Sequence, residues 1–120
     1  MDRQRIGKAA EDAAAAFLRS QGAEILLRNF RLRLGELDII ARDGKSLAIV
    51  EVRNRSSARF GGAAASVDVR KQVKLRRAAA LLLQQRTELG AMPVRFDVIV
   101  VHDPLSRAAR ISWIKHAFTM

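Results

Sequence analysis

Residues 35–55 read GELDIIARDGKSLAIVEVRNR, the most informative stretch of the chain. Two apolar-rich runs, residues 36–41 and 46–53, flank the pair Asp43-Gly44, a sequence typical of a hairpin turn. Side chains alternate between the two faces of a strand. The stretch therefore predicts an antiparallel β-hairpin whose charged residues recur along one face.

The length of the hairpin loop decides which charged side chains lie opposite one another. A two-residue turn sets Glu36 opposite Glu51, with Asp38 on the diagonal. A four-residue loop shifted by one residue sets Asp38 opposite Glu51 instead. Both registers place these three carboxylates and Arg53 on one face, within about 5–8 Å. A loop of odd length would move Glu51 to the other face.

The rest of the chain predicts helices and further strands around this hairpin. Turn and capping signals separate the segments, with Ser66 as the expected cap of the second helix. The expected elements are a helix over residues 4–21, a strand over 24–34, the hairpin strands, a loop over 54–65, a helix over 67–89, and strands over 94–102 and 110–115. This order predicts an α/β domain spanning residues 1–120, with a mixed central sheet flanked by helices.

The composition indicates an anionic partner. The chain has 120 residues, with 22 Lys and Arg against 12 Asp and Glu, for a net charge of +10. Phosphate is a natural partner of such a surface, because guanidinium groups bind phosphate through two parallel hydrogen bonds. The chain has no cysteine, which excludes disulfides, thiolate zinc sites and cysteine nucleophiles. We find no membrane-length apolar run and no signal peptide, so a cytoplasmic protein is expected.

The carboxylates of the hairpin have two interpretations. Carboxylates clustered beside apolar residues need a cation, and hard oxygen ligands are the set that holds Mg²⁺ or Mn²⁺. A basic protein that concentrates acid at one point is then placing a metal where phosphate arrives. The other interpretation is an exposed ladder of salt bridges on a half-solvated hairpin, which predicts no affinity for divalent metals.

The motifs GELDIIARDG (residues 35–44) and IVEVRNR (residues 49–55) resemble the signature of the bacterial YraN family. The resemblance extends over nearly the whole chain, with further matches at Gly7 and Glu11, at residues 29–31, at 95–97 and at 117–118. That family is assigned by similarity to the restriction-endonuclease-like PD-(D/E)-x-K superfamily, near the archaeal Holliday-junction resolvases. The resemblance therefore implies a restriction-endonuclease-like (Holliday-junction-resolvase-like) fold.

The resemblance also implies roles for particular residues. Asp38 and Glu51 match the superfamily's metal ligands for Mg²⁺ or Mn²⁺, the Val52 carbonyl is the expected third ligand, and Glu11 matches an acidic residue of the first helix. The catalytic residues implied are Asp38, Glu51, Arg53 and Lys71. Glu36 is a family feature without an assigned role.

Position 53 departs from the superfamily pattern, because Arg53 stands where a lysine is expected. The lysine is thought to orient water and to stabilise the charge that develops on the phosphate. Arginine can do the second but cannot act as a base at neutral pH. Leu37 also replaces the proline of the motif. The sequence thus supports the nuclease fold more strongly than it supports nuclease activity.

A basic surface is expected on the second helix. Arg70, Lys74 and Arg77 share one helical face and predict a ridge that contacts phosphates, with Arg55 and Arg59 from the preceding loop as further binding residues. A solvated helix face explains the same spacing without a ligand.

These observations lead to two hypotheses on function. The first is a metal-dependent endonuclease acting on DNA, with branched or recombination intermediates as candidate substrates. The second is a non-catalytic protein that binds DNA or structured RNA on a nuclease-like fold. DNA is favoured over RNA as the partner, no membrane is involved, and the resemblance to junction-resolving relatives is compatible with a homodimer.

Overall fold

The computed structural model describes residues 3–55 and 67–119. Its fold is α/β, with a mixed five-stranded sheet between two helices, and is consistent with the expected restriction-endonuclease-like fold. The elements in chain order are α1 (Arg3–Ser20), β1 (Glu24–Leu32), β2 (Gly35–Asp43), β3 (Ser46–Arg55), α3 (Val69–Gln85), the 3₁₀ helix η2 (Thr87–Ala91), β4 (Val94–His102) and β5 (Arg110–Phe118).

The sheet keeps its strands in chain order, β1-β2-β3-β4-β5. The pairs are antiparallel except β3 and β4, which run parallel and are joined by the connection that carries α3. A parallel pair needs such a crossover, and its strands are buried on both faces. The uninterrupted apolar runs of β3 and β4 fit this central position, whereas β1 and β5 at the edges are partly exposed.

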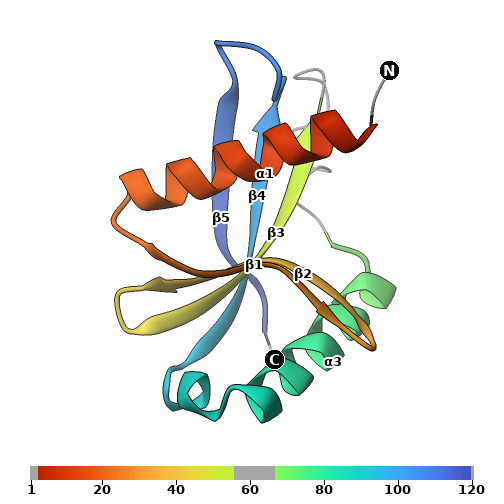
Figure 1. Ribbon diagram of the computed structural model, residues 1–120, viewed down its shortest axis with the longest axis vertical. Helices are drawn as coiled ribbons and strands as arrows, with labels where there is room; N and C mark the ends of the chain where they lie inside the picture. The colour runs from red at the N-terminus through yellow and green to blue at the C-terminus, as the bar shows by residue number, and fades with distance from the viewer. Residues whose placement is uncertain (1–2, 56–66, 120) are drawn as a thin grey trace.

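The helices cover opposite faces of the sheet, as Figure 1 shows. The α1 face is packed with small residues of the helix, Ala10, Ala14 and Ala15, which let α1 approach Ile39 and Val50 closely. The α3 face has the larger core, in which Leu75 and Leu82 of the helix pack with residues such as Phe96. Among the described helices, none combines the length and apolarity needed to cross a lipid bilayer.

Several predicted boundaries shift in the structure. The hairpin loop is Gly44-Lys45, since Asp43 pairs with Ser46, instead of Asp43-Gly44 or a four-residue loop. The register is the one that would set Asp38 opposite Glu51, although the pairing of β2 with β3 ends one residue earlier, at Ile39 and Val50. Gly44 has φ +61°, the conformation that a type II′ turn requires at its first position. The second helix ends at Gln85 rather than near residue 89, and β5 continues to Phe118.

The start of α3 also differs from the prediction. The capping residue is Asp68, whose carboxylate accepts a hydrogen bond from the Lys71 backbone N–H at 2.9 Å. Ser66, the expected cap, lies outside the described residues. Capping by Asp68 starts the helix two residues later and places Lys71 in its first turn.

The sheet divides near the middle of β2, at a point we call the fork. Pairing between β2 and β3 runs from the hairpin loop to Ile39 and Val50. Beyond this point, β2 stays with β1 as far as Gly35, while β3 continues beside β4 to Arg55. Figure 1 shows β1 and β2 turning away from the direction of β3 and β4.

Candidate metal centre

Asp38 lies at the fork and bridges its two branches. Its Oδ2 accepts a hydrogen bond from the Val52 backbone N–H at 3.0 Å, so a side chain takes over where strand pairing stops. Leu37 and Ile40 both pack in the core under α3 although they are three residues apart. The regular alternation of faces is therefore interrupted around Asp38, and charged groups of both helices, Glu11 of α1 and Lys71 of α3, act on its carboxylate.

Three carboxylates meet at this point. Glu11 of α1, Glu36 and Asp38 each place one oxygen so that the three atoms lie within 4.8 Å of one another. Glu36 is exposed, and Glu11 and Asp38 are partly buried. With Glu51 on the other side of Asp38, these residues form what we call the fork cluster. Such oxygen ligands fit Mg²⁺ or Mn²⁺, which prefer carboxylates and water.

The environment of Asp38 disfavours its charge. Burial raises the pKa of this carboxyl group, and the nearby Glu51 and Glu11 carboxylates raise it further, to about 7. The hydrogen bond from Val52 and the charge of Lys71 act in the opposite direction but do not compensate. A carboxylate with a raised pKa binds a cation favourably, because the cation stabilises its charged form.

Glu11 is perturbed in the same direction. Burial raises its pKa, while a hydrogen bond from Asn29 and the charge of Arg28 lower it, and Glu36 raises it again. Asn29 has φ +50°, a left-handed conformation that asparagine adopts more readily than most residues. The bend of β1 therefore places an amide against the α1 carboxylate.

Glu51 meets the positive charge of α3. Its Oε2 lies 3.3 Å from the Lys71 Nζ, and the Glu51 side chain is only 11% exposed. The pair closes the site from the α3 face, opposite the face from which Glu11 enters. The sequence placed Glu36, Asp38, Glu51 and Arg53 on one face. In the structure, Asp38 is approached from both faces, because the fork breaks the alternation.

The remaining predicted site residues are distributed unevenly. Arg53 lies two residues beyond Glu51 on β3, half-buried, and makes no ion pair with a residue that the structure describes. Arg55 lies half-buried at the end of the same strand, and its guanidinium donates to the Asn54 carbonyl. The α3 cations are exposed, and Arg59 lies outside the described residues. The exposed α3 cations are Arg70, Lys74 and Arg77.

Two contributions escaped the sequence analysis. Glu36 was marked by its motif but had no role, and it proves to be a member of the three-carboxylate group. The contacts of Arg28 and Asn29 with Glu11 were not foreseen. Only the packing of α1 on β1 brings these residues together, and no spacing in the sequence reports that packing.

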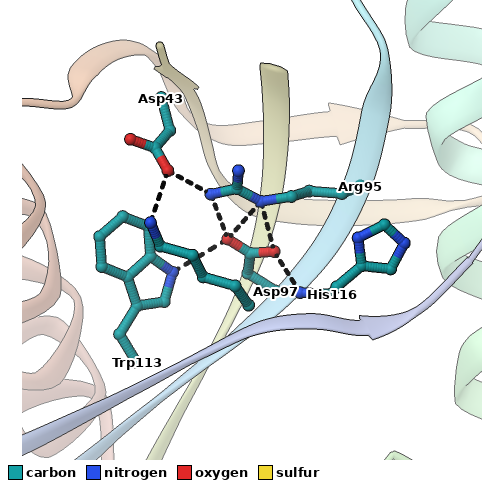
Figure 2. A network of polar contacts seen from close by, with 6 residues as sticks. Asp43, Arg95, Asp97, Trp113 and His116 are labelled. Carbon is teal, nitrogen blue, oxygen red and sulfur yellow. Dashed lines mark hydrogen bonds and ion pairs between the residues drawn. The ribbon is translucent and has the colours of Figure 1, made fainter. Parts of the chain in front are cut away.

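A second pair of carboxylates lies elsewhere in the sheet and is fully paired (Figure 2). Asp97 has no exposed surface and accepts hydrogen bonds from the Arg95 guanidinium, the Trp113 indole N–H and the His116 backbone N–H. Asp43 contacts Arg95 at 2.5 Å and Lys115 at 3.0 Å. We call this group the β4 cluster. Its carboxylates have protein donors for their charge and need no metal.

Comparison with known proteins agrees with this architecture. Residues 10–101 match the model of a family described as "Uncharacterised protein family UPF0102". The chain belongs to the UPF0102 family. UPF0102 proteins similar to it come from Pseudomonas savastanoi, 46% identical over 97% of this chain and 94% of the relative, and from Hahella chejuensis, 47% identical over 95% and 90%. A UPF0102 protein of Xanthomonas oryzae is 47% identical over 97% of this chain and 93% of its own length. The resemblance to YraN-like proteins is thereby confirmed.

Proposed function

We propose that this protein is a metal-dependent endonuclease acting on DNA, with branched or recombination intermediates as candidate substrates. One observation carries the proposal: the carboxylates of Glu11, Glu36 and Asp38 converge at the fork, and the Lys71–Glu51 pair lies on the other side of Asp38. The resemblance to PD-(D/E)-x-K nucleases and the net charge of +10 support the same conclusion.

The donor set fits Mg²⁺ or Mn²⁺. The converging oxygens of Glu11, Glu36 and Asp38 would hold the ion. Glu51, whose charge acts on Asp38, and the Val52 carbonyl, next to the N–H that binds Asp38, would be the further ligands. The bound ion would supply Lewis-acid chemistry to a phosphodiester and to water. The residues contribute by holding several negative charges in a partly buried place. The described cations that form ion pairs with them are Lys71, which contacts Glu51, and the exposed Arg31, which contacts Glu36.

Lys71 is the residue best placed to take the role of the superfamily lysine. Its ammonium contacts Glu51, and its side chain is 45% exposed, so the ammonium can also reach an incoming phosphate. A compact point charge there would orient Glu51 and stabilise the negative charge that develops on the phosphate oxygens. Arg53, without an ion pair to any described residue, is left as a second cation for that charge.

The basic face of α3 continues outward from Lys71. Arg70, Lys74 and Arg77 are exposed on it and, together with Arg55, would bind the phosphates that flank the cleaved one. Such contacts do not read bases. They fit a nuclease that selects its substrate by shape rather than by sequence.

The test is cleavage of labelled linear, flapped and four-way-junction DNA in Mg²⁺ or Mn²⁺. We expect the wild-type protein to cut and both Asp38→Asn and Glu51→Gln, which keep the side-chain shape, to lose cleavage by about 10²-fold or more. Arg42→Gln is the matched control, because Arg42 is exposed and paired with Glu24 away from the fork. Cleavage that survives in both fork variants would contradict the proposal.

A non-catalytic nucleic-acid-binding protein is the second candidate function, and the arginine at position 53 favours it. A binding protein has no use for Asp38 or Glu51, and removing their charge would leave binding unchanged or tighter, because phosphate is then repelled less. Binding without cutting, insensitive to both substitutions, would establish this alternative.

A further inference from the structure

A groove lined by polar side chains lies between α1 and β1 and includes Glu11, a member of the fork cluster. It is lined by Gln4, Gly7, Lys8 and Glu11 of the helix and by Arg28 and Asn29 of the strand, with a volume of about 550 Å³ open to solvent. Glu11 also belongs to the three-carboxylate group, so the groove and the candidate metal centre share a wall. A molecule lying in the groove would therefore reach the proposed site of cleavage.

Gly7 keeps the groove open on the helix side. It lies one helical turn before Glu11, on the same face of α1. A Cβ built at Gly7 would meet nothing within 4 Å, so the space above the helix is empty at this point. The sequence match at Gly7 and Glu11 thus corresponds to an open surface followed by a carboxylate.

The two cations of the groove share one exposed partner. Lys8 lies 3.2 Å and Arg28 2.8 Å from the Asp12 carboxylate. The Nε of Arg28 is buried and has no hydrogen-bond partner among the described residues. Asp12 itself is exposed and Arg28 is half-buried, so both cations can exchange the Asp12 carboxylate for phosphate oxygens, because ion pairs that solvent reaches contribute little to stability.

The charge of the groove depends on what the fork cluster holds. The charges of Lys8 and Arg28 are balanced by those of Asp12 and Glu11 when all four are ionised. Asp38 then adds a further negative charge at the end of the groove, beside the Glu36 carboxylate, which pairs with the exposed Arg31, and this added charge repels phosphate. A divalent cation bound there adds two positive charges and removes this repulsion.

We propose that this groove binds the backbone of one strand of the nucleic acid, next to the cleaved phosphodiester, and that it does so only when a divalent cation occupies the fork cluster. The proposal rests on the proposed nuclease function. The groove is a second binding surface, on the face of the sheet opposite the α3 cations, so the substrate contacts both layers of the fold with the fork between them.

The experiment measures binding of a fluorescently labelled branched oligonucleotide by anisotropy, in Ca²⁺ and in chelator. We expect the double variant Lys8→Gln/Arg28→Gln to bind about tenfold more weakly in Ca²⁺ and less than about twofold more weakly in chelator. The double variant Arg42→Gln/Lys45→Gln is the matched control. It removes the same two kinds of charge from exposed positions near the hairpin loop and should stay within about twofold of wild type in both conditions.

A second variant tests the groove without changing its charge. Gly7→Gln projects a side chain into the open space, and it should not lower the unfolding temperature, because glycine is the less favourable residue within a helix. We expect it to weaken binding in Ca²⁺ while circular dichroism and the unfolding midpoint show an intact fold. It therefore separates loss of the groove from loss of structure.

The outcomes are distinguishable. Wild-type-like binding by Gly7→Gln and by Lys8→Gln/Arg28→Gln, in a protein that cleaves DNA with metal, would overturn the groove assignment and leave the nuclease proposal intact. Equal weakening in Ca²⁺ and chelator would overturn the dependence on the cation. If a deoxynucleoside monophosphate displaced the labelled oligonucleotide as effectively as the unlabelled oligonucleotide does, the groove would be a nucleotide pocket, and the assignment to a nucleic-acid strand would be overturned. Absence of metal-dependent cleavage and of metal binding in the wild type would instead contradict the nuclease function itself.

Discussion

Two acidic clusters lie at the same sheet, one of them with a carboxylate from α1, and they differ in what surrounds their carboxylates. In the β4 cluster, Asp97 is completely buried, yet hydrogen bonds from Arg95, Trp113 and the His116 backbone surround it. In the fork cluster, Asp38 is less buried but receives one backbone hydrogen bond and has carboxylates as neighbours. A buried carboxylate with several hydrogen-bond donors stabilises a fold, whereas one that faces other carboxylates needs a cation to compensate its charge.

The largest expected effect concerns the β4 cluster. Asp97→Ala leaves Arg95 and the Trp113 N–H without their acceptor, and removing one partner of a buried ion pair costs about 3–5 kcal/mol of the free energy of unfolding. Urea unfolding measures this loss. The control is Asp12→Ala, which removes an exposed carboxylate and should cost less than about 1 kcal/mol. Equal losses in the two variants would contradict the structural role of Asp97.

The next prediction concerns Lys71, whose substitution should reduce DNA cleavage without reducing stability. Lys71→Met should reduce single-turnover DNA cleavage by about 10²-fold, since it removes a cation placed to stabilise the reacting phosphate. It should change the free energy of unfolding by less than about 1 kcal/mol, because the Lys71–Glu51 pair is partly exposed. Lys45→Met, in the hairpin loop, is the control. Undiminished cleavage by Lys71→Met would remove Lys71 from the proposed site.

Substitution of Asp38 is expected to have a smaller effect on stability, and to increase it rather than reduce it. Asp38→Asn should raise the free energy of unfolding at pH 8 by about 1–2 kcal/mol in chelator, because it removes a charge that burial and Glu51 disfavour. Asparagine can still accept the hydrogen bond from Val52. Denaturant unfolding of the two proteins at pH 8 measures the difference. A lower stability of Asp38→Asn would contradict the prediction, because it would show that neighbouring groups stabilise the ionised Asp38 carboxylate.

The stability difference between wild type and Asp38→Asn should also depend on pH. The pKa of Asp38 is raised from 3.8 to about 7 in the folded state, so between these values the folded protein holds a proton that the unfolded chain has lost. The contribution of Asp38 to stability is therefore present in acid and is lost as the pH rises through this window. We expect wild type and Asp38→Asn to be similar near pH 4 and to diverge towards pH 7, and saturating Mg²⁺ to reduce the divergence.

The smallest expected effect is at the start of α3. Asp68→Ala removes the cap that binds the Lys71 backbone N–H and should cost about 1 kcal/mol of unfolding free energy. Asp68→Ser, which retains a capping oxygen, should recover most of it. Thermal unfolding followed by circular dichroism distinguishes the two, and an equal loss in both would indicate that Asp68 acts other than as a cap.

Much of the site could be predicted from the hairpin alone. Alternation and the turn signal predicted that Asp38 and Glu51 lie close together, and the structure uses one of the two registers considered, although through the two-residue loop Gly44-Lys45 instead of the four-residue loop expected for it. The sequence could not choose between them, since Gly44 can occupy either position of a short turn. The fork could not be predicted, because alternation shows which way side chains point but not where a neighbouring strand leaves. The meeting of Glu11 with Glu36 depends on how α1 packs, which is a long-range property of the fold.

The parallel pairing of β3 with β4 has a consequence for folding. The β1-β2-β3 meander consists of neighbours in sequence, but β4 pairs with β3 only after the intervening α3 has been brought across the sheet. Closing so long a loop is slow. We expect the Asp38 side of the site to form in the folding transition state before Lys71 arrives, so that substitutions in the β2–β3 hairpin slow refolding while substitutions in α3 mainly accelerate unfolding.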